Sequence, residues 1–307
     1  MQNKHRSLSI SSQKKPHFFV IGAGRVGASL CFQILQKGFP IISLVEKSEK
    51  RLTYLHNEYH WTFLDTSVKL EKISKAHCII ISVQDDFTQI IVEQLAKLDV
   101  NWEGKHVFHC SGILPSSILS PLKKLGALTA SLHPIYSFSL DPRENNHFDK
   151  VWFSVEGENK TKDFVYQYFK SRKNQIIKVN EDQKRAIHLA CVFSANFLVG
   201  LTALSCQILQ KNRLSEIEVL GMLNPLMAST VDHITDQGIL KGLTGPVKRG
   251  DIKTIHAHLN LLKSNYPALL ELYRDISLIL VEQSGLTSQE KKRLKILFSK
   301  IKNSDKN

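Results

Sequence analysis

The sequence predicts an α/β protein in which a domain built on a parallel sheet is followed by an all-α domain. A length of 307 residues is enough for two domains, and 42% hydrophobic with 22% charged residues is a globular composition. Up to about residue 180, short apolar runs alternate with amphipathic helical patterns, as strands and helices do in a parallel sheet covered on both faces. Beyond residue 180 every pattern is helical. We therefore expect domains at 17–180 and 181–307.

The expected strands are short apolar runs spread over the first domain. They comprise residues 17–21, 41–45, 76–83, 105–110, 127–133, 151–157 and 174–179. The first helical pattern ends before Gly38, a residue type that favours the position just past a helix. Further helices are expected at 87–98 and 115–125, and a long one at 181–211 opens the second domain.

Charge is concentrated in the two tails. The net charge is +13, and residues 1–16 together with residues 290–307 supply nine of these charges. Such dispersed charge is typical of solubility rather than of a specific nucleic-acid interface. Residues 1–16 also lack the apolar segment of a secretory signal, so we expect a disordered basic tail, with a transit peptide as the alternative.

Cysteine usage and hydropathy indicate the cellular setting. The five cysteines are scattered and never spaced C-x-x-C, which predicts neither a disulfide framework nor a metal centre and favours a reducing cytoplasm. No clean apolar run reaches the roughly 18–20 residues of a bilayer span. We therefore expect a cytoplasmic protein that has no bound metal, no membrane partner and no specific nucleic-acid partner.

A glycine-rich motif follows the first expected strand and opens the first helix. It reads Gly22-Ala23-Gly24-Arg25-Val26-Gly27. At this position the first glycine allows a tight turn, the second lets the backbone approach a pyrophosphate, and the third lets helix and strand pack closely. The helix N-terminus then presents N–H groups to the phosphates. The motif predicts a Rossmann dinucleotide-binding domain over 17–180; the alternative is a glycine-rich turn without a ligand.

Charged residues at the end of the second strand leave two cofactors open. Glu46 lies 24 residues after Gly22, close to where an acid binds the ribose 2′-hydroxyl of NAD. Lys47, Ser48 and Arg51 follow at once, and such groups suit the 2′-phosphate of NADP. Solvated surface charge is the remaining interpretation.

Polar or small residues follow three further strands, at the edge where ligands of this fold bind. They are Ser82, Val83 and Gln84 after the third strand, Ser111 and Gly112 after the fourth, and His133 at the end of the fifth. We expect the first three to contact the cofactor. Ser111 and Gly112 offer a hydroxyl and N–H groups to a carboxylate or to the nicotinamide amide. His133 is a candidate electrophile or general acid, whereas a structural hydrogen bond is the favoured interpretation for His109.

The second domain contributes two further groups of candidates. On the long helix, His188 and Asn196 are eight residues apart and so share a face, and Asn196 sits in an apolar run where it needs a partner. That partner is a substrate carbonyl or carboxylate, or a neighbouring helix. In the loop 243–251, Arg249 suits a substrate carboxylate, whereas Asp251 is better explained as a helix N-cap.

The ordered motifs resemble one family as a set. They are GAGRVG, SVQDD, HCSG, SLHPIYSF, AIHLACVFSANFLVGL and LTGPVKRGD…HAHL. Over about residues 17–280 they resemble the family that joins a Rossmann-like domain to the C-terminal domain DUF2520. That family is similar to ketopantoate reductases, pyrroline-5-carboxylate reductases and β-hydroxyacid dehydrogenases, whose C-terminal domains are of the 6-phosphogluconate-dehydrogenase type. Some members act as alternative ketopantoate reductases.

The resemblance has implications for cofactor and proton donor. Family members usually carry Ser-Arg-Ser where this chain has Glu46-Lys47-Ser48. Lys47 keeps the positive charge, so the resemblance favours NADP over NAD, although Glu46 departs from the pattern. The relatives place a catalytic Lys one turn before an Asn, but Val192 occupies that place before Asn196. A histidine would then have to supply the proton.

We therefore expect an NAD(P)H-dependent reductase acting on the ketone of a small 2-oxo acid, with 2-dehydropantoate as the most specific substrate. His188 or His133 would protonate the alkoxide and Asn196 would orient the carbonyl. Ser111 and Arg249 would hold the carboxylate, and Thr244 or Asn196 would contact the hydroxyl. A non-catalytic NAD(P)-binding regulatory or scaffold protein is the alternative. The apolar surface of the helical domain predicts a homodimer.

Overall fold

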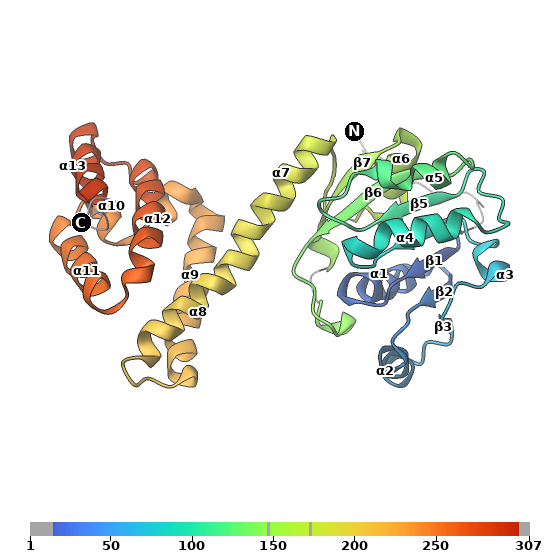
Figure 1. Ribbon diagram of the computed structural model, residues 1–307, viewed down its shortest axis with the longest axis horizontal. Coiled ribbons are helices and arrows are strands. Elements are labelled where there is room, and N and C mark those ends of the chain that lie inside the picture. The colour runs from blue at the N-terminus through green and yellow to red at the C-terminus, as the bar shows by residue number, and fades with distance from the viewer. Residues whose placement is uncertain (1–14, 146–147, 172–173, 301–307) are drawn as a thin grey trace, which may run out of the picture. The chain divides into compact units, whose positions relative to one another are not determined.

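The computed structural model describes residues 15–145, 148–171 and 174–300 (Figure 1). The chain divides into two compact units, Met1–Val199 and Gly200–Asn307, and each is described by itself. The division falls within a long helix rather than at its start near residue 180, so the first turns of that helix belong with the N-terminal unit. The expected disordered tail at 1–16 lies outside the described residues except for its last two.

An eight-stranded sheet forms the centre of the N-terminal unit (Figure 1). Its strands are β1 Phe18–Ile21, β2 Ile41–Val45, β3 Leu64–Asp65, β4 Cys78–Ile81, β5 His106–His109, β6 Leu128–Ile135, β7 Trp152–Gly157 and β8 Ile176–Lys178. Their order in the sheet is β3-β2-β1-β4-β5-β6-β7-β8. The direction in which successive strands are added reverses between β1 and β4, which is where Rossmann sheets open a crevice for their ligand.

The sheet departs from the sequence prediction in two places. Strand β7 runs antiparallel to β6, whereas all other neighbours are parallel. An antiparallel neighbour needs no crossover helix, and the connection from β6 to β7 contains only short 3₁₀ turns in its described part. Strand β3 was not predicted, because two residues are too short to show a pattern.

Helices cover both faces of the sheet. The helices of the N-terminal unit are α1 Arg25–Gln36, α2 Glu49–Tyr59, α3 Leu70–Ile73, α4 Asp85–Ala96, α5 Ser120–Lys123, α6 Asn159–Phe169 and α7 Glu181–Cys191. The side chains of β1 alternate between two apolar cores: Phe18 and Val20 pack in the core that includes α1 and α6, and Phe19 and Ile21 in the core that includes α4. The alternation follows from the two-residue period of a strand.

The described part of the C-terminal unit is helical throughout, as the sequence predicts. Its helices are α8 Phe197–Gln210, α9 Glu216–Gly242, α10 Gly245–Arg249, α11 Ile252–Asn265, α12 Leu270–Gln283 and α13 Ser288–Ser299. Val247, Ile255, Val281 and Phe298 belong to its apolar core. Asp251 accepts a hydrogen bond from the Thr254 N–H at the start of α11, which confirms the N-cap.

Helix α7 continues through a π-helical turn, Val192–Asn196, into α8. The combined helix, Glu181–Gln210, is long and apolar enough to cross a membrane by length and composition, and its most apolar stretch is not buried. The helix itself was predicted at 181–211, but its apolar run was not counted as a candidate span because Ser, Asn and Thr interrupt it.

Candidate functional site

The glycine-rich loop has the geometry that a pyrophosphate requires. Gly22 has φ +98°, and a Cβ on it would lie 2.3 Å from the Ser82 carbonyl oxygen. A Cβ on Gly27 would lie 1.9 Å from the Gly22 carbonyl oxygen, so both positions exclude other residues. Gly24, in contrast, faces open space, and no side chain caps the α1 N-terminus that it opens. The free N–H groups of this helix end fit a phosphate anion.

Glu46 closes this loop from the end of β2. Its Oε2 accepts a hydrogen bond from the Ala23 N–H (2.9 Å), and its Oε1 accepts one from the Ser48 N–H (3.0 Å). The Ser48 hydroxyl accepts in turn from the Arg51 N–H and caps α2. The Glu46 carboxylate therefore links the glycine-rich loop to the start of α2, while the Lys47 side chain beside it is exposed.

Two predicted histidines converge on Gly112. His133 lies on β6 and His188 on α7, and their rings meet edge to face with centroids 5.6 Å apart. A Cβ added to Gly112 would lie 2.3 Å from His188 Nδ1 and 2.9 Å from His133 Nε2. Nδ1 of each ring is buried and has no hydrogen-bond partner in the described structure. These unpartnered nitrogens provide polar atoms that a ligand can satisfy.

Lys184 is a functional candidate that is not among the residues predicted from the sequence. It lies one turn before His188 on α7, its side chain is fully buried, and its ammonium donates to the Leu114 carbonyl. Burial lowers the pKa of Lys184 to about 8, and Glu156, Asp85 and Glu181 partly offset this by favouring the charged form. A buried lysine with a pKa near neutrality is typical of a functional site.

The positive charge of Lys184 also affects its neighbours. Burial, together with His188 and Lys184, lowers the pKa of His133 to about 4, so this ring is neutral near pH 7. Burial likewise lowers the pKa of His109 to about 3. His109 Nε2 lies 3.2 Å from the Pro115 carbonyl oxygen, in agreement with the structural hydrogen bond favoured for it. A neutral His133 is suited to hydrogen bonding rather than to donating a proton as an imidazolium.

The loop residues connect the glycine-rich motif to this cluster. Ser82 follows β4 against Gly22, and its side chain forms a hydrogen bond with Cys110, the residue after β5. The Ser111 hydroxyl accepts from the N–H groups of Ile113 (3.2 Å) and Leu114 (3.0 Å), so its oxygen shapes the loop that presents Gly112. Gln84 begins α4 and is exposed, and Val83 contacts the side of Gly22.

The remaining predicted site residues lie on the long helix and in the helical unit. Asn196 lies at the end of the π-helical turn and its side chain is exposed, so the substrate or helix partner expected for it stays a prediction. Thr244 and Arg249 lie in the helical unit, both exposed, and their substrate contacts stay predictions.

The helical unit has a groove of its own. It has a volume of about 380 Å³ and is lined mainly by apolar side chains of α8, α11 and α12, with Thr244 at its edge. His258 Nδ1 lies 3.0 Å from the Tyr273 hydroxyl in its wall.

Comparison with known proteins agrees with this architecture. Residues 3–134 match the family described as "Rossmann-like domain", and residues 151–279 match "Domain of unknown function (DUF2520)". No curated protein matches the chain. Among solved structures, protein TM1727 from Thermotoga maritima is 25% identical with a TM-score of 0.66, covering 87% of this chain and 98% of its own.

Two further solved structures share the fold at lower identity. BF3122 from Bacteroides fragilis, named as a proposed NADP oxidoreductase, is 22% identical with a TM-score of 0.69, covering 87% of this chain and 98% of its own. The pyrroline carboxylate reductase of Plasmodium falciparum, solved with NADP bound, is 13% identical with a TM-score of 0.57, covering 92% of this chain and 98% of its own.

Proposed function

The chain belongs to the family that joins a Rossmann-like domain to a DUF2520 domain, and from this premise we propose that it is an NAD(P)H-dependent reductase of a small 2-oxo acid. The observation that carries the proposal is the convergence of Lys184, His133 and His188 around Gly112, beyond the carboxyl ends of the strands. The contact from Ser82 to Cys110 connects the glycine-rich loop to the loop that carries Gly112, which supports the proposal that a dinucleotide extends from the first loop towards the cluster.

The cofactor side of the site follows from the loop geometry. The α1 N-terminus and the open face of Gly24 hold the pyrophosphate. NADP is the preferred cofactor, because Lys47 is exposed next to the N-terminus of α2 and both oxygens of Glu46 already accept main-chain N–H groups. The names of two structural neighbours include NADP, which agrees with this preference. When bound, the cofactor supplies a hydride.

The substrate side is assigned to the basic cluster. Hydride addition to a ketone leaves an alkoxide that needs one proton, and His188 donates it. The ammonium of Lys184 stabilises the negative charge that develops on the oxygen, since a buried charge acts strongly there. His133, neutral near pH 7, orients the ketone by a hydrogen bond. Ser111 and Arg249 hold the carboxylate, and 2-dehydropantoate is the first substrate to test.

A cofactor-oxidation assay tests the proposal. Purified protein is mixed with NADPH or NADH and a series of 2-oxo acids that includes 2-dehydropantoate, and loss of the reduced nicotinamide absorbance is followed. We expect turnover with NADPH, and His188→Gln should reduce kcat by about 10²–10⁴-fold. Cofactor binding without turnover of any 2-oxo acid would favour the non-catalytic regulatory or scaffold role. Absence of cofactor binding would refute the proposal.

The helical unit is proposed to form a homodimer. Ile217, Leu226 and Ile239 on α9 are 85%, 61% and 63% exposed. The same unit carries the apolar groove, and two copies related by a two-fold axis can cover one another's exposed apolar side chains. Asp232 and Asp236, both exposed on α9, favour a protein partner over lipid.

A further inference from the structure

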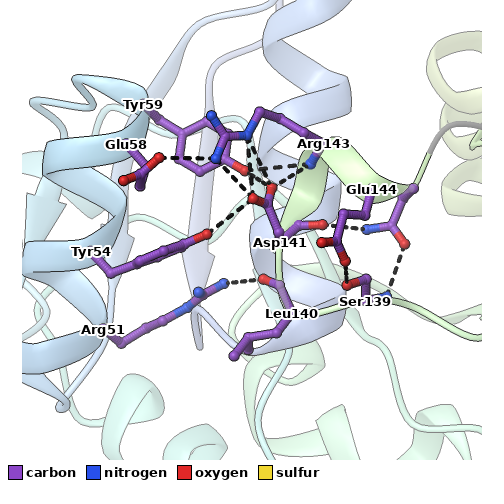
Figure 2. Close-up of polar contacts among 10 residues, drawn as sticks. Arg51, Tyr54, Glu58, Tyr59, Ser139, Leu140, Asp141, Arg143 and Glu144 are labelled. Carbon is purple, nitrogen blue, oxygen red and sulfur yellow. Dashed lines mark hydrogen bonds and ion pairs between the residues drawn. The ribbon is translucent and has the colours of Figure 1, made fainter. Parts of the chain in front are cut away.

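A segment between β6 and β7 lies against helices α1 and α2. We call residues 138–145 the strap. Arg25 Nη1 on α1 donates to the carbonyl of Phe138 (3.4 Å), and Asn145 Nδ2 donates to the Ser29 hydroxyl on α1 (2.9 Å). On the α2 side, Arg51 Nη2 donates to the Leu140 carbonyl (2.9 Å), as Figure 2 shows. The strap is thus attached to both helices that flank the glycine-rich loop.

Asp141 anchors the middle of the strap (Figure 2). Its carboxylate accepts hydrogen bonds from the hydroxyls of Tyr54 (3.1 Å) and Tyr59 on α2, and it forms an ion pair with Arg143 (2.8 Å). Arg143 reaches Glu58 as well (3.0 Å). The hydrogen bonds from Arg143 and the two tyrosines hold the pKa of Asp141 well below its usual range. At neutral pH the anchor is therefore fully ionised and in contact with α2.

Arg51 connects this anchored strap to the glycine-rich loop. Its Nε donates to the Ala23 carbonyl (2.8 Å) while its Nη2 donates to Leu140, and its guanidinium lies 5.1 Å from the centroid of the Tyr54 ring. The N–H of the same Ala23 is held by Glu46. The peptide groups on both sides of Ala23 are therefore fixed by side chains from the end of β2 and the first turn of α2.

We propose that Arg51 is a positioning residue for the dinucleotide, held by the strap, and that it is not a ligand of the 2′-phosphate. Its donors Nε and Nη2 are used by two main-chain carbonyls, so it fixes the orientation of the Ala23–Gly24 turn against which the pyrophosphate packs. The pyrophosphate is common to NADH and NADPH. Loss of Arg51 should therefore weaken both cofactors by the same factor, whereas loss of Lys47 should weaken NADPH alone. The inference rests on the proposed function, because it concerns the same cofactor site.

The test measures cofactor affinity directly in the full-length protein, so it does not depend on the identity of the substrate. Dissociation constants for NADPH and NADH are determined by calorimetry for the wild type, Arg51→Gln and Lys47→Gln. We expect Arg51→Gln to weaken both cofactors about tenfold, the size of a lost charge-assisted hydrogen bond. Lys47→Gln is expected to weaken NADPH only. Arg185→Gln, which removes an exposed arginine paired with Glu181, is the control and should change neither constant.

Further variants separate positioning from general destabilisation. Arg51→Lys can still donate to one carbonyl and should recover part of the affinity, and Asp141→Asn should weaken both cofactors by a smaller, equal factor. Melting temperatures measured without cofactor show whether each variant is folded, and Arg51→Lys carries the test if Arg51→Gln is not. A loss confined to NADPH, or affinity unchanged in Arg51→Gln, would overturn the inference. A wild type that binds neither cofactor would instead overturn the proposed function.

Discussion

The contact of two histidines with Gly112 makes a methyl group at that position an informative perturbation. A Cβ on residue 112 would lie 2.3 Å from His188 Nδ1, whereas ordinary van der Waals contact begins at 3.4 Å, so the ring must move by about 1 Å. A misplacement of 1 Å in a reacting group costs on the order of 100-fold in rate. We therefore expect Gly112→Ala to reduce kcat about 100-fold while the affinity for the cofactor is unchanged.

The assay is the NADPH-oxidation assay with the best 2-oxo acid, combined with calorimetry for cofactor affinity and thermal unfolding. Crowding in a buried site should also destabilise the fold by about 1–3 kcal/mol. Gly200→Ala is the matched control, because nothing lies within 4 Å of its added Cβ and its φ lies outside the left-handed range. Gly112→Ala with wild-type kcat would refute the assignment of His188, since the ring cannot stay in place beside the new methyl.

Two further predictions concern Lys184 and the helical unit. Because burial lowers the pKa of Lys184 to about 8, the ammonium loses its proton as pH rises through 8, so kcat/KM for reduction should fall above that pH. This decline in kcat/KM should be absent in Lys184→Met. A decline that persists in the variant would exclude Lys184 as its source. For the dimer, light scattering of the wild type should give twice the monomer mass of 34.9 kDa. The control Tyr166→Glu, which changes a 51% exposed side chain on α6, should also give the dimer mass, whereas Ile217→Asp combined with Leu226→Glu should give the monomer mass. A wild type that is monomeric, or that partitions into lipid vesicles, would refute the dimer.

Local patterns were sufficient to predict seven of the eight strands because most of these strands contain a short apolar run. The expected strand at 41–45 coincides with β2, and the other expected strands differ from β1 and β4–β8 by a few residues at their ends. The antiparallel direction of β7 could not be predicted in this way. It depends on how residues 136–151 return to the sheet, and the apolar pattern of a strand is the same in either direction.

The phosphate loop was predictable for a related reason, since backbone contacts require glycine at two positions of the motif and the third position is open. Gly22 and Gly27 are crowded by the Ser82 and Gly22 carbonyls, and Gly24 is open to a ligand. The same residue types at the same spacing therefore predict the same loop. The strap, in contrast, brings residues 138–145 to α2 across more than 80 positions of sequence, and no local pattern indicates that Arg51 is bonded to it.

Lys184 shows why the proposed catalytic cluster was predicted only in part. His133 and His188 were identified because a histidine at a strand end or within an apolar run is conspicuous by itself. A lysine in the first turn of a helix that begins Glu-Asp-Gln-Lys looks like part of a solvated N-terminus, and the sequence around it is polar. It is buried because the loop after β5 supplies the Leu114 carbonyl, 70 residues earlier in the chain, as a partner for its ammonium. The pKa of Lys184 near 8 thus results from tertiary contacts. The spacing Lys184-x-x-x-His188 becomes informative only in the structure, where both side chains lie against the loop after β5 that carries Gly112.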